Sequence, residues 1–305
     1  MSVPNLSPAV LQARLKIEAP SPVERFQPFW AGAEKVEICI KRDDLLHPII
    51  SGNKWRKLKY ALLSLPPGTR QIISFGGGFS NHLHALAYAC FKLDIAFTAI
   101  VRGDYSKKLT QTLEDIKKWG ARLRFVTRIE YQKKEDNTYL AALLKEFSDA
   151  VIIPEGGSQL AAIQGVSEIV EEQQHQSDII MAPVGSGATL AGLINSASSS
   201  QQVIGVATLK GENYLESLVE RLLPDSTHAD WKILHNYHHG GYAKSSAELR
   251  RFCADTTSTY KIPLEPVYSG KLFFAAQQLI SSGYFAPGTR IMLLHTGGLQ
   301  GARTK

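Results

Sequence analysis

The sequence predicts an α/β protein in which parallel sheets are flanked by helices. Short runs rich in β-branched and apolar residues alternate along the chain with longer segments of helical periodicity. Several of the short runs are apolar on both faces, as strands of a buried parallel sheet must be. The chain has 305 residues, which is more than one hydrophobic core usually supports. We therefore expect two globular units.

The predicted elements follow from period and composition. The strands are expected at 35–40, 71–75, 95–101, 122–126, 150–154, 178–184, 202–208 and 290–295. The helices are expected at 54–65, 81–93, 107–119, 136–147, 158–175, 188–198, 211–222, 246–256 and 270–282. No repeat, low-complexity tract or Pro/Gly-rich linker marks a boundary between the two units.

Composition narrows the class of protein. Hydrophobic residues make up 44% and charged residues 20%, as in a packed globular protein. The net charge of +6 is spread among nearly as many acids, so it suits a small anionic substrate as well as a nucleic acid, and we expect no nucleic-acid partner. Cys39, Cys90 and Cys253 are too few and too far apart for a disulfide framework or a zinc site. We therefore expect a reducing cytoplasm and no metal.

Membrane and secretion signals are also missing from the sequence. The first residues contain no apolar signal-peptide core, and no apolar run approaches the roughly 20 residues that a spanning helix needs. We expect a soluble, unsecreted protein with no membrane partner.

In parallel sheets, ligands bind beyond the carboxyl ends of the strands, and unusual loops follow three of the predicted strands. In "VGSGATLAG" several backbone N–H groups can converge at a helix start, and hydroxyl donors stand beside them, which suits a phosphate monoester. We call this segment the anion loop; it consists of Gly185, Ser186, Gly187, Ala188 and Thr189. A tight strand-to-helix turn without a ligand would use the same glycines.

The other two loops have plain alternatives as well. "FGGGFSNH" places Ser80, Asn81 and His82 at a helix start, where they could hold a carboxylate, although Ser80 could serve only as the helix N-cap. "HTGG" places the Thr296 hydroxyl where it could bond a ring nitrogen without charging it, although a simple turn explains these residues too.

Lys54 lies in "SGNKWRKLKYALL", where a polar turn becomes a helix with many basic residues. Taken alone, Lys54 would be a solvated lysine at a helix start. A phosphate site, a carboxylate site, a hydroxyl for a ring nitrogen and a lysine are together the parts that hold pyridoxal phosphate as an imine. The combination therefore favours a role for Lys54 as the cofactor-binding lysine.

The motifs "SGNKWRKL", "FGGGFSNH", "PEGGS", "GSGAT", "PVYSGK" and "HTGG", in this order, resemble one known family. These are the fold-type II pyridoxal-phosphate enzymes of the 1-aminocyclopropane-1-carboxylate deaminase and D-cysteine desulfhydrase family, whose fold is similar to tryptophan synthase β. The resemblance implies a larger cofactor-binding domain, residues 1–59 plus 159–305, a smaller inserted domain, residues 60–158, and a homodimer.

The resemblance also implies roles for individual residues. Lys54 would be the Schiff-base lysine and the base, Asn81 would bond the 3′-oxygen of the cofactor, and the anion loop would hold its phosphate. Ser80, Asn81 and His82 would receive the substrate carboxylate. Ser80, Tyr242 in "HGGYAK" and Tyr268 in "PVYSGK" would belong to the catalytic set, although most tyrosines serve packing.

Two positions separate the substrates within the family. Ring-opening enzymes of the family carry Glu directly after the second tyrosine and Leu between His and Gly-Gly, where this sequence has Ser269 and Thr296. This pattern resembles the desulfhydrases, whereas Leu83 and His84 stand where relatives commonly have an Arg. We expect a lyase that converts D-cysteine into pyruvate, ammonia and sulfide. A 1-aminocyclopropane-1-carboxylate deaminase and a non-catalytic binder of a phosphate ligand remain the alternatives.

Overall fold

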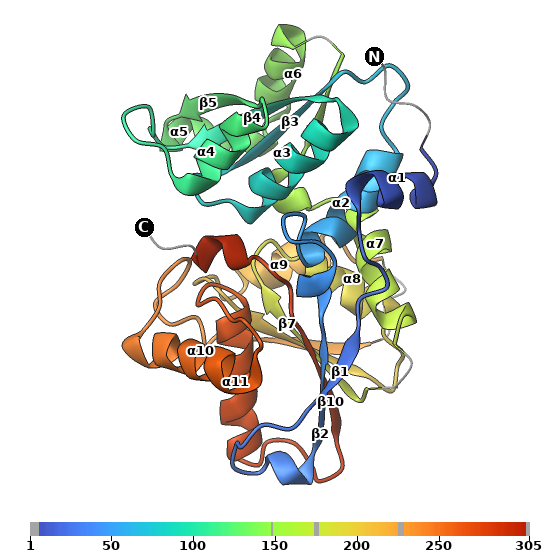
Figure 1. The fold of residues 1–305 in the computed structure, drawn as a ribbon, viewed down its shortest axis with the longest axis vertical. Coiled ribbons are helices and arrows are strands. Elements are labelled where there is room, and N and C mark those ends of the chain that lie inside the picture. Colours follow the sequence, from blue (N-terminus) through green and yellow to red (C-terminus); the bar gives the residue numbers. More distant parts are fainter. Residues whose placement is uncertain (1–5, 148, 174–176, 225–228, 303–305) are drawn as a thin grey trace.

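The computed structural model describes residues 6–147, 149–173, 177–224 and 229–302 and contains two β-sheets, stacked along the long axis in Figure 1. The larger sheet has six strands in the order β1-β2-β10-β7-β8-β9. Only the pair β1 and β2 is antiparallel. The strands of the larger sheet are β1 (Val23–Phe26), β2 (Glu37–Lys41), β7 (Ile179–Val184), β8 (Gln202–Ala207), β9 (Asp230–Leu234) and β10 (Arg290–Leu294).

The smaller sheet has four strands in the order β5-β4-β3-β6, all parallel. They are β3 (Gln71–Gly77), β4 (Ala96–Arg102), β5 (Arg122–Val126) and β6 (Ala150–Ile153). Together with the larger sheet they confirm the predicted α/β class with helix-flanked, mainly parallel sheets.

Helices cover both sheets and fill the space between them (Figure 1). α2 lies between the two sheets and packs against α7, which in turn packs against α8. The helices are α1 (Pro8–Leu15), α2 (Asn53–Leu63), α3 (Asn81–Leu93), α4 (Gln111–Lys118), α5 (Arg128–Tyr131), α6 (Asn137–Glu146), α7 (Leu160–Glu171), α8 (Ala188–Ser196), α9 (Tyr214–Glu220), α10 (Ala247–Tyr260) and α11 (Ser269–Ser281).

The larger sheet is buried on both faces. Along β10, Ile291 and Leu293 belong to the cluster on the side of α10 and α11, whereas Met292 and Leu294 belong to the cluster on the side of α7 and α8. Successive residues of a strand point to opposite faces, so a strand covered on both faces has to be apolar throughout. This explains why the β10 sequence reads as a continuous apolar run.

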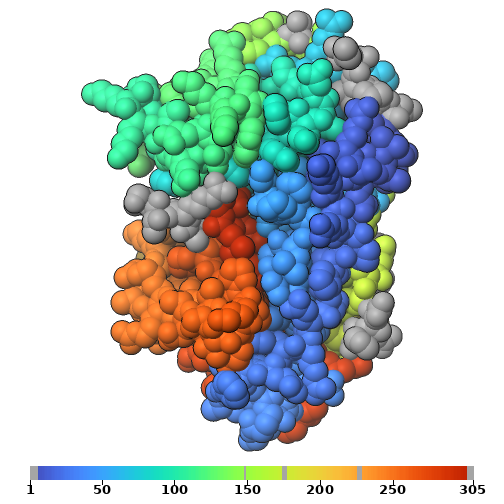
Figure 2. Space-filling view, in the orientation of Figure 1, coloured from blue at the N-terminus to red at the C-terminus, as the bar shows by residue number. Residues whose placement is uncertain are grey.

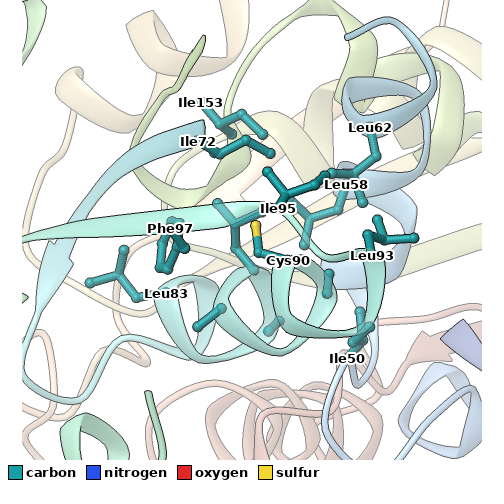
Figure 3. Packing of buried hydrophobic residues seen from close by; sticks show 14 of the residues in the cluster. Ile50, Leu58, Leu62, Ile72, Leu83, Cys90, Leu93, Ile95, Phe97 and Ile153 are labelled. Atoms are coloured by element: carbon teal, nitrogen blue, oxygen red, sulfur yellow. The ribbon is translucent and has the colours of Figure 1, made fainter. Parts of the chain in front are cut away.

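The core beside the smaller sheet draws residues from distant parts of the chain (Figure 3). Leu58 of α2 and Cys90 of α3 are fully buried together with Ile72 of β3. Leu11 and Leu15 of α1 belong to the same cluster. The N-terminal segment, blue in Figure 2, accordingly lies along both halves of the molecule. The proposed domain boundaries near 59 and 159 stay a prediction.

A buried ionic cluster fixes α2. The Arg56 guanidinium is fully buried and lies 3.0 Å from Asp43 and 2.6 Å from Glu172, which follows α7. Lys41 Nζ, at the end of β2, also lies 2.7 Å from Glu172. A buried charge is tolerated when it is paired in this way. The start of α2 is therefore held against both the larger sheet and α7.

Some predicted elements need correction. α1, β1, α5 and β9 were not predicted from the sequence, and α4 begins four residues later than the predicted 107–119 helix. The predicted 158–175 helix ends at Glu171, and residues 174 and 175 lie outside the described part of the chain. Within that part, no helix is long and apolar enough to cross a membrane.

Candidate active site

Lys54 is placed by an unusually close backbone contact at the start of α2. Gly52 has φ +63°, and a Cβ atom built on it would lie 1.7 Å from the carbonyl oxygen of Thr296. Only glycine permits this approach. The turn before Lys54 therefore packs directly on the loop that follows β10, which places Thr296 beside the turn that leads into Lys54.

Asn53 connects Lys54 with the anion loop. Lys54 Nζ donates to Asn53 Oδ1 at 2.6 Å, and Asn53 Nδ2 donates to Thr189 Oγ1 at 2.8 Å. From the sequence, Asn53 is only a turn and helix-cap residue. In the structure it links the proposed cofactor lysine to the segment that would hold the phosphate.

The surroundings of Lys54 favour its neutral amine. Removal of the ammonium from water lowers the pKa of Lys54 to about 8, and the carboxylate of Glu265 opposes this shift. A lysine has to lose its proton before it can act as a nucleophile or a base. Lys54 thus has a larger neutral fraction near neutral pH than an ordinary lysine, although most of it is still protonated at pH 7.

The anion loop joins the carboxyl end of β7 to α8. Gly187 has φ +83°, and a Cβ atom on it would lie 3.1 Å from the Leu218 backbone. Ala188 and Thr189 are buried at the start of α8, so backbone N–H groups of the first helical turn point out of its end. This arrangement of free N–H groups suits a phosphate.

Lys57 places its amine at the anion loop. Its Nζ donates to Ser186 Oγ at 3.0 Å and to the carbonyl oxygen of Gly156 at 3.1 Å. Burial and the neighbouring charge of Lys54 lower the pKa of Lys57 well below the ordinary lysine value. An arriving phosphate dianion would favour the charged form again. Lys57 was not predicted as a site residue, although its place one helical turn after Lys54 was a usable signal.

Asn81 joins the loop after β3 to the loop after β10. Asn81 Nδ2 donates to the carbonyl oxygen of Gly298 at 3.4 Å, whereas its Oδ1 is buried without a hydrogen-bond partner. Ser80 is the N-cap of α3, since its Oγ accepts from the Leu83 N–H at 3.2 Å. The capping function of Ser80 is thus present, and its proposed catalytic and carboxylate-binding roles stay predictions.

His82 is buried and neutral. Ser74 Oγ donates its proton to the carbonyl oxygen of Ile153 at 2.7 Å, so it must accept from His82 Nε2, which lies 2.8 Å away. His82 Nδ1 is then an acceptor, and it is buried without a partner. Desolvation, followed by the charges of Lys54 and Lys57, lowers the pKa of His82 to about 3. His82 therefore offers no positive charge to a carboxylate.

The two predicted tyrosines lie together beside the anion loop. A Cβ atom on Gly185 would lie 3.3 Å from the Tyr268 ring, and the rings of Tyr242 and Tyr268 are 6.3 Å apart. Burial and the neighbouring Tyr242 raise the pKa of Tyr268 well above the ordinary value, so its phenol keeps its proton. Tyr242 remains 47% exposed.

Glu265 also belongs to the site, although no sequence motif pointed to it. It is buried and accepts from the backbone N–H groups of Val267, Tyr268 and Ser269, at 2.6, 2.7 and 2.8 Å. These groups belong to the turn that begins α11, so Glu265 fixes the backbone of Tyr268.

The residues fit pyridoxal phosphate. The glycines of the anion loop leave space where a Cβ atom would crowd the Tyr268 ring, and Lys57 adds a cation. Asn81 keeps an unpaired buried oxygen, and a lysine with a lowered pKa lies at the start of α2. Among the described residues, no group of three or more His, Cys, Asp or Glu side chains could hold a metal ion.

The chain is similar to known pyridoxal-phosphate enzymes. The model of the pyridoxal-phosphate dependent enzyme family matches residues 15–297. The chain is 31% identical over 301 residues to an Arabidopsis thaliana protein named bifunctional D-cysteine desulfhydrase/1-aminocyclopropane-1-carboxylate deaminase, mitochondrial. That match covers 88% of this chain and 74% of the plant protein.

Two further relatives extend the comparison. A Pyrococcus abyssi protein with the provisional name 1-aminocyclopropane-1-carboxylate deaminase is 30% identical over 284 residues, which cover 87% of this chain and 86% of that protein. A crystal structure described as an ACC deaminase homologue superimposes with a TM-score of 0.79 at 26% identity, over 96% of this chain and 95% of the other.

The predictions of an enzyme, of the fold-type II class and of the cofactor are thereby confirmed. The chain belongs to the pyridoxal-phosphate dependent enzymes, within the family of 1-aminocyclopropane-1-carboxylate deaminases and D-cysteine desulfhydrases, and pyridoxal phosphate is its cofactor.

Proposed function

We propose that this enzyme acts on a small amino acid and eliminates its β-substituent, with D-cysteine as substrate and pyruvate, ammonia and sulfide as products. The substrate assignment rests on Ser269 and Thr296, which are neutral side chains at the two positions that separate substrates in the family. Opening of the cyclopropane ring of 1-aminocyclopropane-1-carboxylate is the competing activity, and the names of the relatives include both.

The surroundings of Ser269 and Thr296 support this choice. Ser269 is fully buried, and its Oγ accepts from the backbone N–H of Glu265 at 3.0 Å. Thr296 lies against Gly52, beside the turn that carries Lys54. A hydroxyl beside the pyridine nitrogen leaves the ring less electron-withdrawing than an acid would. Elimination from a substrate with an acidic α-hydrogen and a good leaving group tolerates this weaker electron withdrawal.

Pyridoxal phosphate, when bound, supplies the electron sink for negative charge at the substrate α-carbon. The protein supplies the remaining functions. Lys54 removes the α-proton, because its lowered pKa gives it a larger neutral fraction near neutral pH than an ordinary lysine has. Asn53 orients the Lys54 amine through the 2.6 Å hydrogen bond. Lys57 and the anion loop hold the phosphate.

The start of α3 binds the substrate, and the two tyrosines assist the leaving group. The substrate carboxylate is received by the Ser80 hydroxyl and by the N–H groups at the start of α3, among them those of Asn81 and the His82 backbone. Tyr268 keeps its proton at neutral pH and can donate a hydrogen bond to the departing thiolate, with Tyr242 beside it. The proton that Lys54 removes from the α-carbon balances any proton that the thiolate takes up. We include Ser80 with Tyr242, Tyr268 and Lys54 among the catalytic residues.

Parallel assays with D-cysteine, L-cysteine and 1-aminocyclopropane-1-carboxylate test the proposal. Sulfide and pyruvate from D-cysteine, with no product from the other two, is the expected result. Release of 2-oxobutanoate from the cyclopropane substrate would reject the substrate assignment but leave the enzyme class intact. Binding of the cofactor without turnover of any of the three would favour a non-catalytic phosphate-ligand protein.

A homodimer and a cytoplasmic location complete the proposal. The three cysteines Cys39, Cys90 and Cys253 are all unpaired, as expected in a reducing compartment. Light scattering of the purified protein measures the oligomeric state, and a mass of one chain would reject the homodimer.

A further inference from the structure

Lys271 is a buried cation next to the proposed catalytic tyrosines. It lies in the first turn of α11 and is fully buried. Its Nζ donates to the carbonyl oxygen of Thr208 at 2.8 Å and to the carbonyl oxygen of Gly241 at 2.9 Å. Thr208 follows β8, and Gly241 directly precedes Tyr242. The Lys271 side chain therefore connects the end of β8, in the larger sheet, to the segment that carries Tyr242.

The segment that Lys271 holds has an unfavourable backbone conformation. His239, Gly240, Gly241 and Ala243 all have positive φ values, namely 48°, 95°, 112° and 55°. A left-handed conformation costs about 1–2 kcal/mol for a residue other than glycine. Such a backbone persists when contacts hold it in place. We call residues 238–243 the tyrosine loop.

The ammonium of Lys271 is suited to holding this loop. Both partners are backbone carbonyls, and an ammonium provides three donors and no acceptor. Desolvation lowers the pKa of Lys271 to about 8, and the Glu265 carboxylate opposes the shift. A buried cation is costly, so a position that needed packing alone would be filled better by an apolar side chain such as methionine.

We propose that Lys271 is a positioning residue, which acts through Tyr242 by fixing the tyrosine loop against Tyr268. The inference concerns a residue to which the family comparison assigned no role. Its link to catalysis rests on the proposed function, whereas its hold on the tyrosine loop does not.

Hydrogen–deuterium exchange of the holoenzyme tests the structural part. In Lys271→Met we expect amide exchange in residues 237–246 to rise about tenfold, which corresponds to the loss of one buried hydrogen bond. Lys41→Met is the matched control, because Lys41 is also a fully buried lysine that donates to a carbonyl oxygen, Ser21 O at 2.7 Å, but belongs to the Arg56 cluster. Exchange in 237–246 should equal the wild type in this control.

Steady-state kinetics tests the functional part. We expect Lys271→Met to lower kcat about tenfold with little change in KM, and to leave the absorbance of the bound cofactor as in the wild type. In a Tyr242→Phe background the same substitution should have almost no further effect on kcat, because both changes remove one function. If Lys271→Met only disturbed packing in general, the two substitutions would lower kcat independently, and their effects on kcat would multiply.

The outcomes separate the two proposals. Unchanged exchange in 237–246, or multiplicative effects on kcat, would overturn the role of Lys271. A wild-type enzyme without turnover of any substrate would overturn the proposed function, and the exchange experiment would still decide the loop contact. If Lys271→Met does not fold, Lys271→Gln, which keeps N–H donors on a shorter side chain, undergoes the same measurements with faster exchange expected.

Discussion

Asn53 Nδ2 lies 2.8 Å from Thr189 Oγ1, so the first turn of α2 and the first turn of α8 share a buried hydrogen bond. The same Asn53 side chain accepts a hydrogen bond from Lys54 Nζ, so one residue connects the lysine with the anion loop.

Asn53→Ala should weaken pyridoxal phosphate binding about 10-fold. The substitution frees both Lys54 and the anion loop, and a buried hydrogen bond costs about 1–3 kcal/mol when it is broken. Equilibrium titration of the apoenzyme measures the Kd. The exposed substitution Asn137→Ala at the start of α6 is the control, and an Asn53→Ala Kd equal to that of the control would contradict the assignment.

Gly52→Ala should be among the most damaging single substitutions in the chain. The new Cβ atom would lie 1.7 Å from the Thr296 carbonyl oxygen, and the backbone has φ +63°. We expect a loss of about 4 kcal/mol or more in the free energy of unfolding, measured by urea denaturation. Gly68→Ala is the control, since Gly68 has φ +87° but no atom within 4 Å of the new Cβ. It should lose only about 1–2 kcal/mol, and equal losses would show that the contact with Thr296 has no energetic weight.

Ala243→Gly should stabilise the protein. Ala243 has φ +55°, a conformation that glycine adopts without strain. The expected gain in the free energy of unfolding is about 1 kcal/mol. Ala142→Gly, in the exposed face of α6, should lose about 1 kcal/mol because glycine weakens a helix interior. A loss for both variants in urea denaturation would contradict the predicted strain at Ala243.

The pKa of Lys54 predicts how reaction with an aldehyde depends on pH. The pKa is lowered from 10.5 to about 8, so the amine becomes neutral as pH rises through 8. The rate at which the apoenzyme captures pyridoxal, which lacks the phosphate, should rise between pH 7 and about 9 and then level off. Lys54→Ala should remove this phase. A rate that keeps rising through pH 10 would indicate a lysine with an ordinary pKa.

The sequence predicted the buried parallel strands well, because a strand covered on both faces shows a continuous apolar run. β1 has four residues, of which only Phe26 is buried, and β9 has one buried residue, Ile233. Both are edge strands of the larger sheet, and they leave little trace in a hydrophobic pattern. α1 was missed because it is short and buries only Leu11 and Leu15.

The site was predictable where a loop sequence carries its own geometry. The anion loop and Asn81 follow strands at the carboxyl edges of the sheets; Asn53 links the anion loop to Lys54, and Asn81 contacts Gly298 in the loop after β10. The partners of α2 were not predictable, because they come from distant segments. Arg56 and Lys57 read as part of a basic helix face, yet both are buried. Arg56 and Lys57 are therefore not solvated residues of a helix start. Glu265 and Lys271 bond to backbone groups, and although Lys271 ends the motif "PVYSGK", the motif does not show which carbonyl oxygens it contacts.

The central claim is that the cofactor is bonded to Lys54 and to no other lysine. Lys57 and Lys271 lie in the same region and also have lowered pKa values, so they are the natural competitors. Borohydride reduction of the holoenzyme makes the lysine–cofactor bond permanent, and peptide mass spectrometry then locates it. We predict the pyridoxyl group on Lys54 in the peptide that begins α2. A label on Lys57 or Lys271, with Lys54 unmodified, would contradict the account.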